Sequence, residues 1–323
     1  MSPELLRSLV LDGLLILVSI GLLWKGADVL VESAARIGRR LGLSELVIGL
    51  TIVAFGTSAP EFAVTLQAAL AGRSDISVGN VVGSNIFNLG FVLGGVALIR
   101  GIGTSRSVVW RDASFLIGIT LLLRLFINDQ HLVRVEGLTM IALLVVYLGI
   151  LFWQRDGLIE LDELAPGQGG WRDGLLLLVG VAVVVGGGHL LVESASSLAR
   201  AFGVSDWVIG VTIVAAGTSS PELFTSLVAA TRGHHGISVG NLIGSDLFNL
   251  LGVLGLAAVI NPRMVVDPDA LASVSVLIVM VVLVWIFLRT GWRLSRLEGA
   301  LLVGINAVRW VADFTGNGLR LPW

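Results

Sequence analysis

The stretch Gly56-Thr57-Ser58-Ala59-Pro60-Glu61 returns 161 residues later as Gly217-Thr218-Ser219-Ser220-Pro221-Glu222. Each copy lies inside a hydrophobic run that is long enough to cross a lipid bilayer. A carboxylate in the middle of such a run is costly, and an ionisable residue at that depth usually serves function. The two copies therefore predict that Glu61 and Glu222 meet at one buried site.

The composition places the chain in a membrane. Hydrophobic residues make up 55% of the chain and charged residues 14%, whereas soluble domains carry about 25% charged residues. The net charge of -2 gives no basic face for nucleic acid, and the absence of Cys excludes disulfides and thiolate metal sites. The first apolar run has no small-residue cleavage site behind it, so we expect a membrane helix there rather than a signal peptide.

A helix needs about 20 apolar residues to cross a bilayer, and by this rule the sequence predicts an all-α polytopic membrane protein with ten transmembrane helices. The predicted spans cover residues 9–35, 44–71, 77–99, 107–127, 132–153, 172–197, 205–231, 238–260, 270–289 and 296–314. Arg residues are moderately more frequent in the loops after odd-numbered spans, which favours extracytoplasmic termini. We therefore expect a multi-pass protein of the cell (inner) membrane with a cytoplasmic acidic linker.

The sequence repeats internally. Between residues 30–89 and residues 191–250, 34 of the 60 aligned positions are identical without a gap. We therefore divide the chain into a first five-helix repeat (1–153), the acidic linker (154–171) and a second five-helix repeat (172–323). Because five is odd, the second repeat must enter the membrane inverted relative to the first, an arrangement characteristic of secondary transporters.

Both copies of the opening motif predict a broken helix, in the second and the seventh span. Pro60 lacks an N–H and clashes with the preceding turn, and Gly56 eases the break. Carbonyl groups freed inside the membrane must be satisfied by the protein or by a bound ion, so the carbonyls of Ala54 and Ala215 are candidate ligands. Hydroxyl groups one turn from the carboxylates add further oxygens: Thr57, Ser58, Thr218 and Ser219.

The third and eighth spans supply a second set of oxygens. Ser84 and Asn88 are four residues apart and share a helix face, and Ser245 and Asn249 repeat this pair. One Asn extends each face by a turn, and two Gly residues permit close approach of a neighbouring backbone. These residues are Asn80, Gly79 and Gly83 in the first repeat, and Asn241, Gly240 and Gly244 in the second.

These candidate ligands together suit a hard divalent cation. Ca²⁺ takes about six to eight oxygen ligands, with carboxylates among them, and one Ca²⁺ would neutralise both Glu61 and Glu222. Without a cation the two like charges destabilise each other in a low dielectric, so the site should not cross the membrane unloaded. Pairing of each carboxylate with Arg is the alternative, but neither broken span contains Arg or Lys.

The two motifs resemble those of the calcium:cation antiporter superfamily, and most closely its prokaryotic sodium/calcium exchanger branch. The resemblance rests on Gly56-Thr57-Ser58-x-Pro60-Glu61 and Gly79-Asn80-x-x-Gly83-Ser84-Asn85-x-x-Asn88, both repeated, and the ten-span layout extends it over nearly the whole chain. It implies a secondary antiporter that exchanges Ca²⁺ for Na⁺ by alternating access, with four central ion sites and the first and sixth spans as a sliding gate.

The resemblance also implies a role for each candidate residue. Glu61 and Glu222 would be the main Ca²⁺ ligands. A serine and an asparagine from each repeat would complete the site: Ser84, Asn88, Ser245 and Asn249. The hydroxyls and carbonyls beside the breaks would join them and also bind Na⁺: Thr57, Ser58, Thr218, Ser219, Ala54 and Ala215.

One position departs from the family pattern. Some exchangers of this branch carry Asp where this chain has Asn249, so the site here has two acids rather than three. Asp246 lies three positions earlier, about 60° away around a helix, and we expect it to face a neighbouring helix or water. The departure leaves the coupling ion open, and a proton-coupled antiporter, or a Na⁺-coupled one that also needs K⁺, is the alternative.

Other classes of function fit less well. There is no Walker motif, so ATP is not the driving force, and no catalytic arrangement suits a membrane metalloprotease. We expect a transporter and not an enzyme, with no cofactor beyond the transported ions and no obligatory protein partner. A channel is disfavoured because an inverted repeat with two broken helices suits alternating access. Glu32 and Glu193, which match across the repeat, either line an ion vestibule or lie at an interface.

Overall fold

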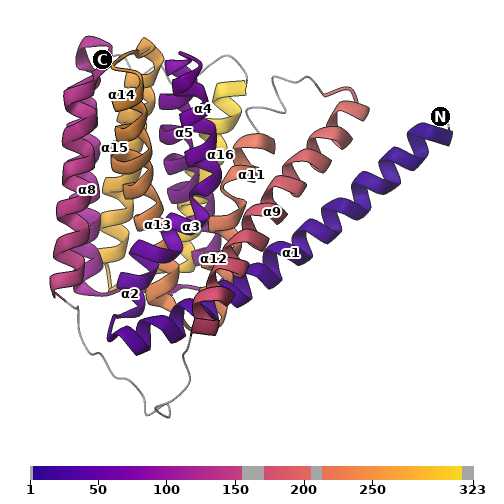
Figure 1. Cartoon of the computed structure of the whole chain (residues 1–323), viewed down its shortest axis with the longest axis horizontal. Helices are drawn as coiled ribbons and strands as arrows, with labels where there is room; N and C mark the ends of the chain where they lie inside the picture. Colours follow the sequence, from indigo (N-terminus) through magenta and orange to yellow (C-terminus); the bar gives the residue numbers. More distant parts are fainter. Residues whose placement is uncertain (1–2, 155–170, 205–212, 315–323) are drawn as a thin grey trace.

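The computed structural model describes residues 3–154, 171–204 and 213–314, and these residues are mainly helical (Figure 1). Six helices in the described part are long and apolar enough to cross a membrane, or seven if the bent pair Glu45–Thr57 and Ala59–Leu70 forms one span. The chain is therefore an all-α membrane protein, as predicted. Nearly all of the predicted linker and the beginning of the predicted seventh span lie outside the described residues.

Helices of the first half follow the predicted spans, although the first helix is longer than expected. They are α1 (Pro3–Leu41), α2 (Glu45–Ile48), η1 (Gly49–Val53), α3 (Ala54–Thr57), α4 (Ala59–Leu70), α5 (Ser74–Phe87), η2 (Asn88–Leu93), α6 (Gly94–Ile99), η3 (Val108–Ala113), α7 (Ser114–Phe126), η4 (Ile127–Asp129) and α8 (Arg134–Gln154). The stretches η1, η2 and η3 are π-helical and run into α-helix without a break. Such wider turns are frequent at functional sites.

The second half repeats the order of the main helices where it is described, although one continuous helix, α15, stands where the first half has η3, α7 and η4. Its helices are α9 (Trp171–Ala201), α11 (Ala215–Thr218), α12 (Ser220–Thr231), α13 (His235–Leu247), the π-helical η6 (Phe248–Leu254), α14 (Gly255–Ile260), α15 (Pro268–Arg289) and α16 (Arg296–Phe314). Short strands lie between helices: β1 (Ile102–Gly103), β2 (His131–Val133), β3 (Arg263–Val265) and β4 (Arg293–Leu294).

The strand pairing follows the repeat. β1 pairs with β4 and β2 pairs with β3, both antiparallel. The offset of 161 residues relates β1 to β3 and β2 to β4. Exchanging the two halves of the chain therefore exchanges the two ladders, as expected for a two-fold relation between the repeats.

The second span bends at the predicted place. α3 ends at Thr57, Ser58 leaves the helical conformation with φ -77° and ψ 6°, and α4 continues at 52° to the preceding helix. Pro60 is the second residue of α4, where its missing N–H needs no helical partner. In the other repeat, α11 and α12 meet at Ser219 with the same change in backbone conformation (φ -87°, ψ 6°).

Glycine residues bring several backbones into contact. α1 and α9 lie side by side and slant away from the upright bundle (Figure 1). A Cβ atom on Gly26 would lie 2.9 Å from the backbone nitrogen of Val184, and one on Gly180 would lie 2.8 Å from that of Leu30.

The predicted glycine stripe on the eighth span also packs closely. A Cβ atom on Gly240 or Gly244 would lie 2.7 Å from backbone atoms of Leu46 or Leu50. No described atom lies within 4 Å of such a Cβ on Gly79 or Gly83. The residues equivalent to Leu46 and Leu50, at 207 and 211, fall outside the described ranges.

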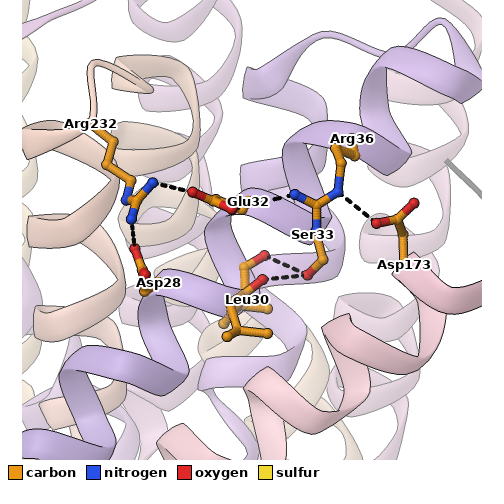
Figure 2. Close-up of polar contacts among 8 residues, drawn as sticks. Asp28, Leu30, Glu32, Ser33, Arg36, Asp173 and Arg232 are labelled. Carbon is orange, nitrogen blue, oxygen red and sulfur yellow. Dashed lines mark hydrogen bonds and ion pairs between the residues drawn. The ribbon is translucent and has the colours of Figure 1, made fainter. Parts of the chain in front are cut away.

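A network of charges connects α1 to two other helices (Figure 2). Arg232, which follows α12, forms ion pairs with Asp28 and Glu32 of α1. Arg36, one turn further along α1, contacts Glu32 at 3.4 Å and Asp173 of α9 at 2.6 Å. The network therefore joins α1, α9 and the end of α12.

The other repeat lacks this network in the described residues. Ser197 replaces Arg36 and donates a hydrogen bond to Asp12, the counterpart of Asp173, at 2.7 Å. Ala71 replaces Arg232. The side chains of His189 and Glu193, the counterparts of Asp28 and Glu32, are 82% and 74% exposed. Glu32 is thus an interfacial ion-pair residue, whereas Glu193 faces outward from the protein.

Candidate ion-binding site

Two carboxylates lie at the centre of the fold. Glu61 is in the first turn of α4 and Glu222 is in the first turn of α12, and both side chains are fully buried. Each carboxylate contacts a serine hydroxyl beside the break of the other repeat, which brings the two side chains to one place. No ion pair among the described residues involves either of them. A wet carboxylate paired with Arg, the alternative raised by the sequence, is therefore not what the described residues form.

Hydroxyl groups from each repeat contact the carboxylate of the other. Ser58 Oγ donates to Glu222 Oε1 at 3.2 Å, and Ser219 Oγ donates to Glu61 Oε1 at 3.2 Å. Thr57 Oγ1 donates to Asn241 Oδ1, which also belongs to the other repeat, at 3.0 Å. Thr218, at the same position of the second repeat, is buried. The two broken helices are thus connected crosswise at their breaks.

The serine and asparagine residues predicted on the third and eighth spans contact this centre differently in the two repeats. Ser245 Oγ donates to Glu222 Oε1 at 3.1 Å and lies 2.8 Å from Ser58 Oγ. Asn88 Nδ2 donates to Ser245 Oγ at 3.3 Å. Ser84 is almost buried in α5, but its hydroxyl makes no hydrogen bond to a carboxylate among the described residues. The two halves of the site are therefore not identical.

Among the predicted ligand residues, four buried oxygens are left without a hydrogen-bond partner in the described part of the chain. They are Glu61 Oε2, Glu222 Oε2, Asn88 Oδ1 and Asn249 Oδ1. A buried acceptor without a partner is costly, and each of these atoms is an oxygen of the kind that Ca²⁺ and Na⁺ bind. They come from four different elements, α4, α12, η2 and η6.

The carbonyls beside the breaks are less clearly available. Ala54 O accepts hydrogen bonds from Ser58 N at 3.0 Å and from Thr57 Oγ1 at 3.3 Å. Ala215 is the first residue of α11. In the described residues, no group of three or more His, Asp or Glu side chains is placed to hold a metal ion. A cation held here would be bound by two carboxylates and by neutral oxygens.

Asparagine side chains of α5 and α13 hydrogen-bond to the broken helices α4 and α12. Asn80 Nδ2 donates to Thr65 Oγ1 at 2.9 Å and to Glu61 O at 3.4 Å. Asn241 Nδ2 makes the equivalent bonds to Ser226 Oγ at 2.9 Å and Glu222 O at 3.4 Å. Sequence analysis assigned no role to Thr65 and Ser226. The sequence feature that could have pointed to them is a hydroxyl group at the same position of both repeats.

Two further residues lie next to the site. Asp246 is fully buried, and its Oδ1 accepts a hydrogen bond from Asn88 Nδ2 at 3.2 Å. It therefore faces a neighbouring helix, one of the two environments predicted for it, and water does not reach it. Asn85, its counterpart in the first repeat, accepts a hydrogen bond from Asn249 Nδ2 at 3.1 Å. A polar residue at this position in both repeats was the available signal.

This geometry agrees with the family that the sequence motifs resemble. A sequence model described as "Sodium/calcium exchanger protein" matches residues 12–153 and 174–311. The chain belongs to the sodium/calcium exchanger family. Because the members of this family are transporters, this exchanger-family protein is a membrane cation transporter and not an enzyme.

Relatives of this exchanger-family chain match along most of its length. CaxA of Alkalimonas amylolytica is 39% identical over 300 residues, which cover 89% of this chain and 94% of CaxA. The inner membrane protein YrbG of Escherichia coli (strain K12) is 34% identical over 92% of this chain and 95% of its own. A structure of the sodium-calcium exchanger NCX_Mj, soaked with Na⁺ and Sr²⁺, superposes with a TM-score of 0.82 at 29% identity and covers 94% of this chain and 98% of NCX_Mj.

Proposed function

We propose that this chain is a secondary active antiporter that exchanges Ca²⁺ for Na⁺ by alternating access. The observation that carries the proposal is the set of four partnerless buried oxygens, two from carboxylates and two from amides, at the meeting point of the broken helices. Ca²⁺ prefers oxygen ligands with carboxylates among them. The soaking of the related NCX_Mj crystals with Na⁺ and Sr²⁺ gives further support.

Charge balance explains why exchange would be coupled. The carboxylates of Glu61 and Glu222 carry two negative charges when ionised, and no cationic side chain among the described residues neutralises them. One Ca²⁺, or more than one Na⁺, restores neutrality. Moving the empty charged pair through a low-dielectric protein is unfavourable. The carrier therefore changes sides only when loaded, and ions of one kind leave only when ions of the other kind enter.

The ion ligands in this proposal come from both repeats. Glu61 and Glu222 bind Ca²⁺ directly, and hydroxyl, amide and carbonyl oxygens around them complete the coordination of Ca²⁺ or hold Na⁺. The supplementary ligands are Thr57, Ser58, Thr218, Ser219, Ser84, Ser245, Asn88, Asn249, Ala54 and Ala215. Ser84 and the Ala54 carbonyl take part only after a small rearrangement, because neither is directed at the carboxylates in this conformation.

The proposed architecture is ten transmembrane helices in two inverted repeats, 1–153 and 172–323, joined by a cytoplasmic linker. Strand pairing supports the inversion. β1 and β2 lie at opposite ends of the helix that runs from Val108 to Phe126, and β3, the repeat counterpart of β1, pairs with β2. Equivalent strands therefore lie at opposite ends of the helices. The similarity to the inner membrane protein YrbG supports placement in the inner membrane, with both termini outside the cytoplasm.

The test is transport by the purified protein in lipid vesicles. Na⁺-loaded proteoliposomes are diluted into Na⁺ or choline medium that contains ⁴⁵Ca²⁺, and a parallel arm imposes a pH gradient in place of the Na⁺ gradient. We expect ⁴⁵Ca²⁺ uptake only when Na⁺ can flow outward. Adding K⁺ to either medium tests whether K⁺ is required as well.

Other outcomes identify the alternatives. Uptake that ignores Na⁺ and follows the pH gradient would assign the chain to proton-coupled exchange, the alternative left open by Asn249. Uptake that needs no counter-ion gradient would indicate a channel. In either case the assignment of Na⁺ as the coupling ion would be wrong, while family membership would stand.

A further inference from the structure

We infer that Asp246 is a positioning residue that orients the ion-binding amides of both repeats. The inference deepens the proposed function and rests on it. Asp246 lies in α13 with its side chain fully buried, three residues before Asn249. Its carboxyl group and its backbone carbonyl each begin a separate hydrogen-bond relay. The two relays end at the amides of Asn88 and Asn249, whose oxygens have no partner in the described residues.

The first relay is direct. Asn88 Nδ2 donates to Asp246 Oδ1 at 3.2 Å. Asp246 Oδ1 is the acceptor of this bond, so the NH₂ end of the Asn88 amide faces Asp246. The oxygen end, Asn88 Oδ1, consequently points away from Asp246, and it is one of the buried oxygens without a partner. Asp246 thus selects the amide orientation that presents an oxygen rather than an NH₂ group to a cation.

The second relay passes through Asn85. Asn85 Nδ2 donates to the backbone carbonyl of Asp246 at 3.0 Å. Because a backbone carbonyl can only accept, the NH₂ end of Asn85 is held there and its oxygen end remains to accept. Asn249 Nδ2 donates to Asn85 Oδ1 at 3.1 Å. Asn249 Oδ1 is left without a partner among the described residues, in the same state as Asn88 Oδ1.

The two relays are related by the repeat but differ in charge. Asn85 accepts a hydrogen bond from the NH₂ group of Asn249, as Asp246 does from that of Asn88. A neutral amide oxygen is therefore a sufficient acceptor in one of the two relays. Partners that orient the ligands of a metal ion are typically worth about 10- to 100-fold in affinity. The rival role for Asp246 is direct binding of the ion, because its Oδ2 also has no partner in the described part and its side chain contacts the proposed ligand Asn88.

The test measures equilibrium ⁴⁵Ca²⁺ binding and the apparent KM for uptake with the full-length protein. Asp246→Asn keeps an oxygen acceptor, so we expect both constants to stay within about twofold of wild type. Asp246→Asn should thus retain the binding that Asp246→Leu loses. Asp246→Leu removes the acceptor, and we expect Ca²⁺ affinity to fall by about 10-fold or more.

A double-mutant cycle separates positioning from a structural effect. Asp246→Leu should add little to Asn88→Ala, because both remove the same oriented oxygen. It should add its full effect to Asn249→Ala, whose relay uses the backbone carbonyl that Asp246→Leu retains. Additivity with both alanine variants would overturn the inference in favour of general destabilisation.

The remaining outcomes are also decisive. If Asp246→Asn weakens binding as much as Asp246→Leu does, the carboxylate itself binds the ion and the positioning role is wrong. If wild type binds no Ca²⁺, the proposed function fails and takes this inference with it. That failure is recognised at once, because it appears before any variant is compared.

Discussion

At the scale of single residues, the site is defined by what its two carboxylates lack. Glu61 and Glu222 are buried in the first turns of facing helices, receive hydroxyl hydrogen bonds on one oxygen each, and leave the other oxygen without a partner in the described residues. The positive end of each helix dipole favours a negative charge there. Hydroxyl groups alone do not neutralise two charges, so the pair would need a proton or, as proposed, a bound cation.

Replacing either carboxylate by its amide tests this assignment. Glu61→Gln and Glu222→Gln keep size and hydrogen-bonding capacity but remove one negative charge, and we expect each to weaken ⁴⁵Ca²⁺ binding by more than about 100-fold. Glu193→Gln makes the same change at a side chain that is 74% exposed and should bind Ca²⁺ as wild type does. The measurement is equilibrium binding alongside thermal unfolding. Near-normal binding in Glu61→Gln or Glu222→Gln would remove that residue from the site.

The sequence singles out these residues because their depth in apolar spans and their repetition can be seen in it. The carboxylates and the hydroxyls beside them lie in apolar spans, where a polar side chain kept twice is rarely incidental. The relay from Asp246 to Asn88 could not be predicted, since it joins residues from different repeats. The angle between Asp246 and Asn249 was estimated on an α-helix, but π-helical η6 begins at Phe248, between them.

At the scale of elements, apolar length and proline predict the helices and the bend, whereas the π-helical turns go unseen. η2 begins at Asn88, and η6 contains Asn249. Both stretches have the apolar composition of ordinary α-helix, and both lie where helices of the two repeats pack together. The glycines of α13 are part of that packing, because Gly240 and Gly244 admit the backbone of the second span.

The bend at Pro60 should matter for binding more than for stability. Pro60→Ala restores an N–H that can continue the helix across Ser58 and turn the hydroxyls away from the opposite carboxylate. We expect Ca²⁺ affinity to fall by about 10-fold, with a stability change of about 1 kcal/mol or less. Pro268→Ala, the same change at the first residue of α15, is the control and should leave affinity unchanged. Equal affinities in the two variants would show that Ser58 alone maintains the bend.

At the scale of the whole molecule, the two ends of the α1–α9 pair are in different states. One end is closed by the network of Asp28, Glu32, Arg36, Asp173 and Arg232 (Figure 2). At the counterpart positions of the other repeat, His189 and Glu193 are exposed. If the repeats exchange conformations during transport, the network must open and the region around Glu193 must close. Under such an exchange the network would stabilise the present conformation over its opposite.

Arg232→Ala should shift this balance, and the absence of native Cys makes the shift measurable with one introduced thiol. The reporter is Glu193→Cys, labelled with a membrane-impermeant maleimide. Arg232 is partly exposed, and losing such ion pairs costs about 1 kcal/mol, which corresponds to a change of up to about fivefold in the ratio of the two conformations. We expect slower labelling of Cys at 193, because the opposite conformation covers that position. Arg296→Ala removes an exposed arginine that makes no ion pair among the described residues, and it should not change the rate. Unchanged labelling in Arg232→Ala would mean that the network holds helices together without biasing the gate.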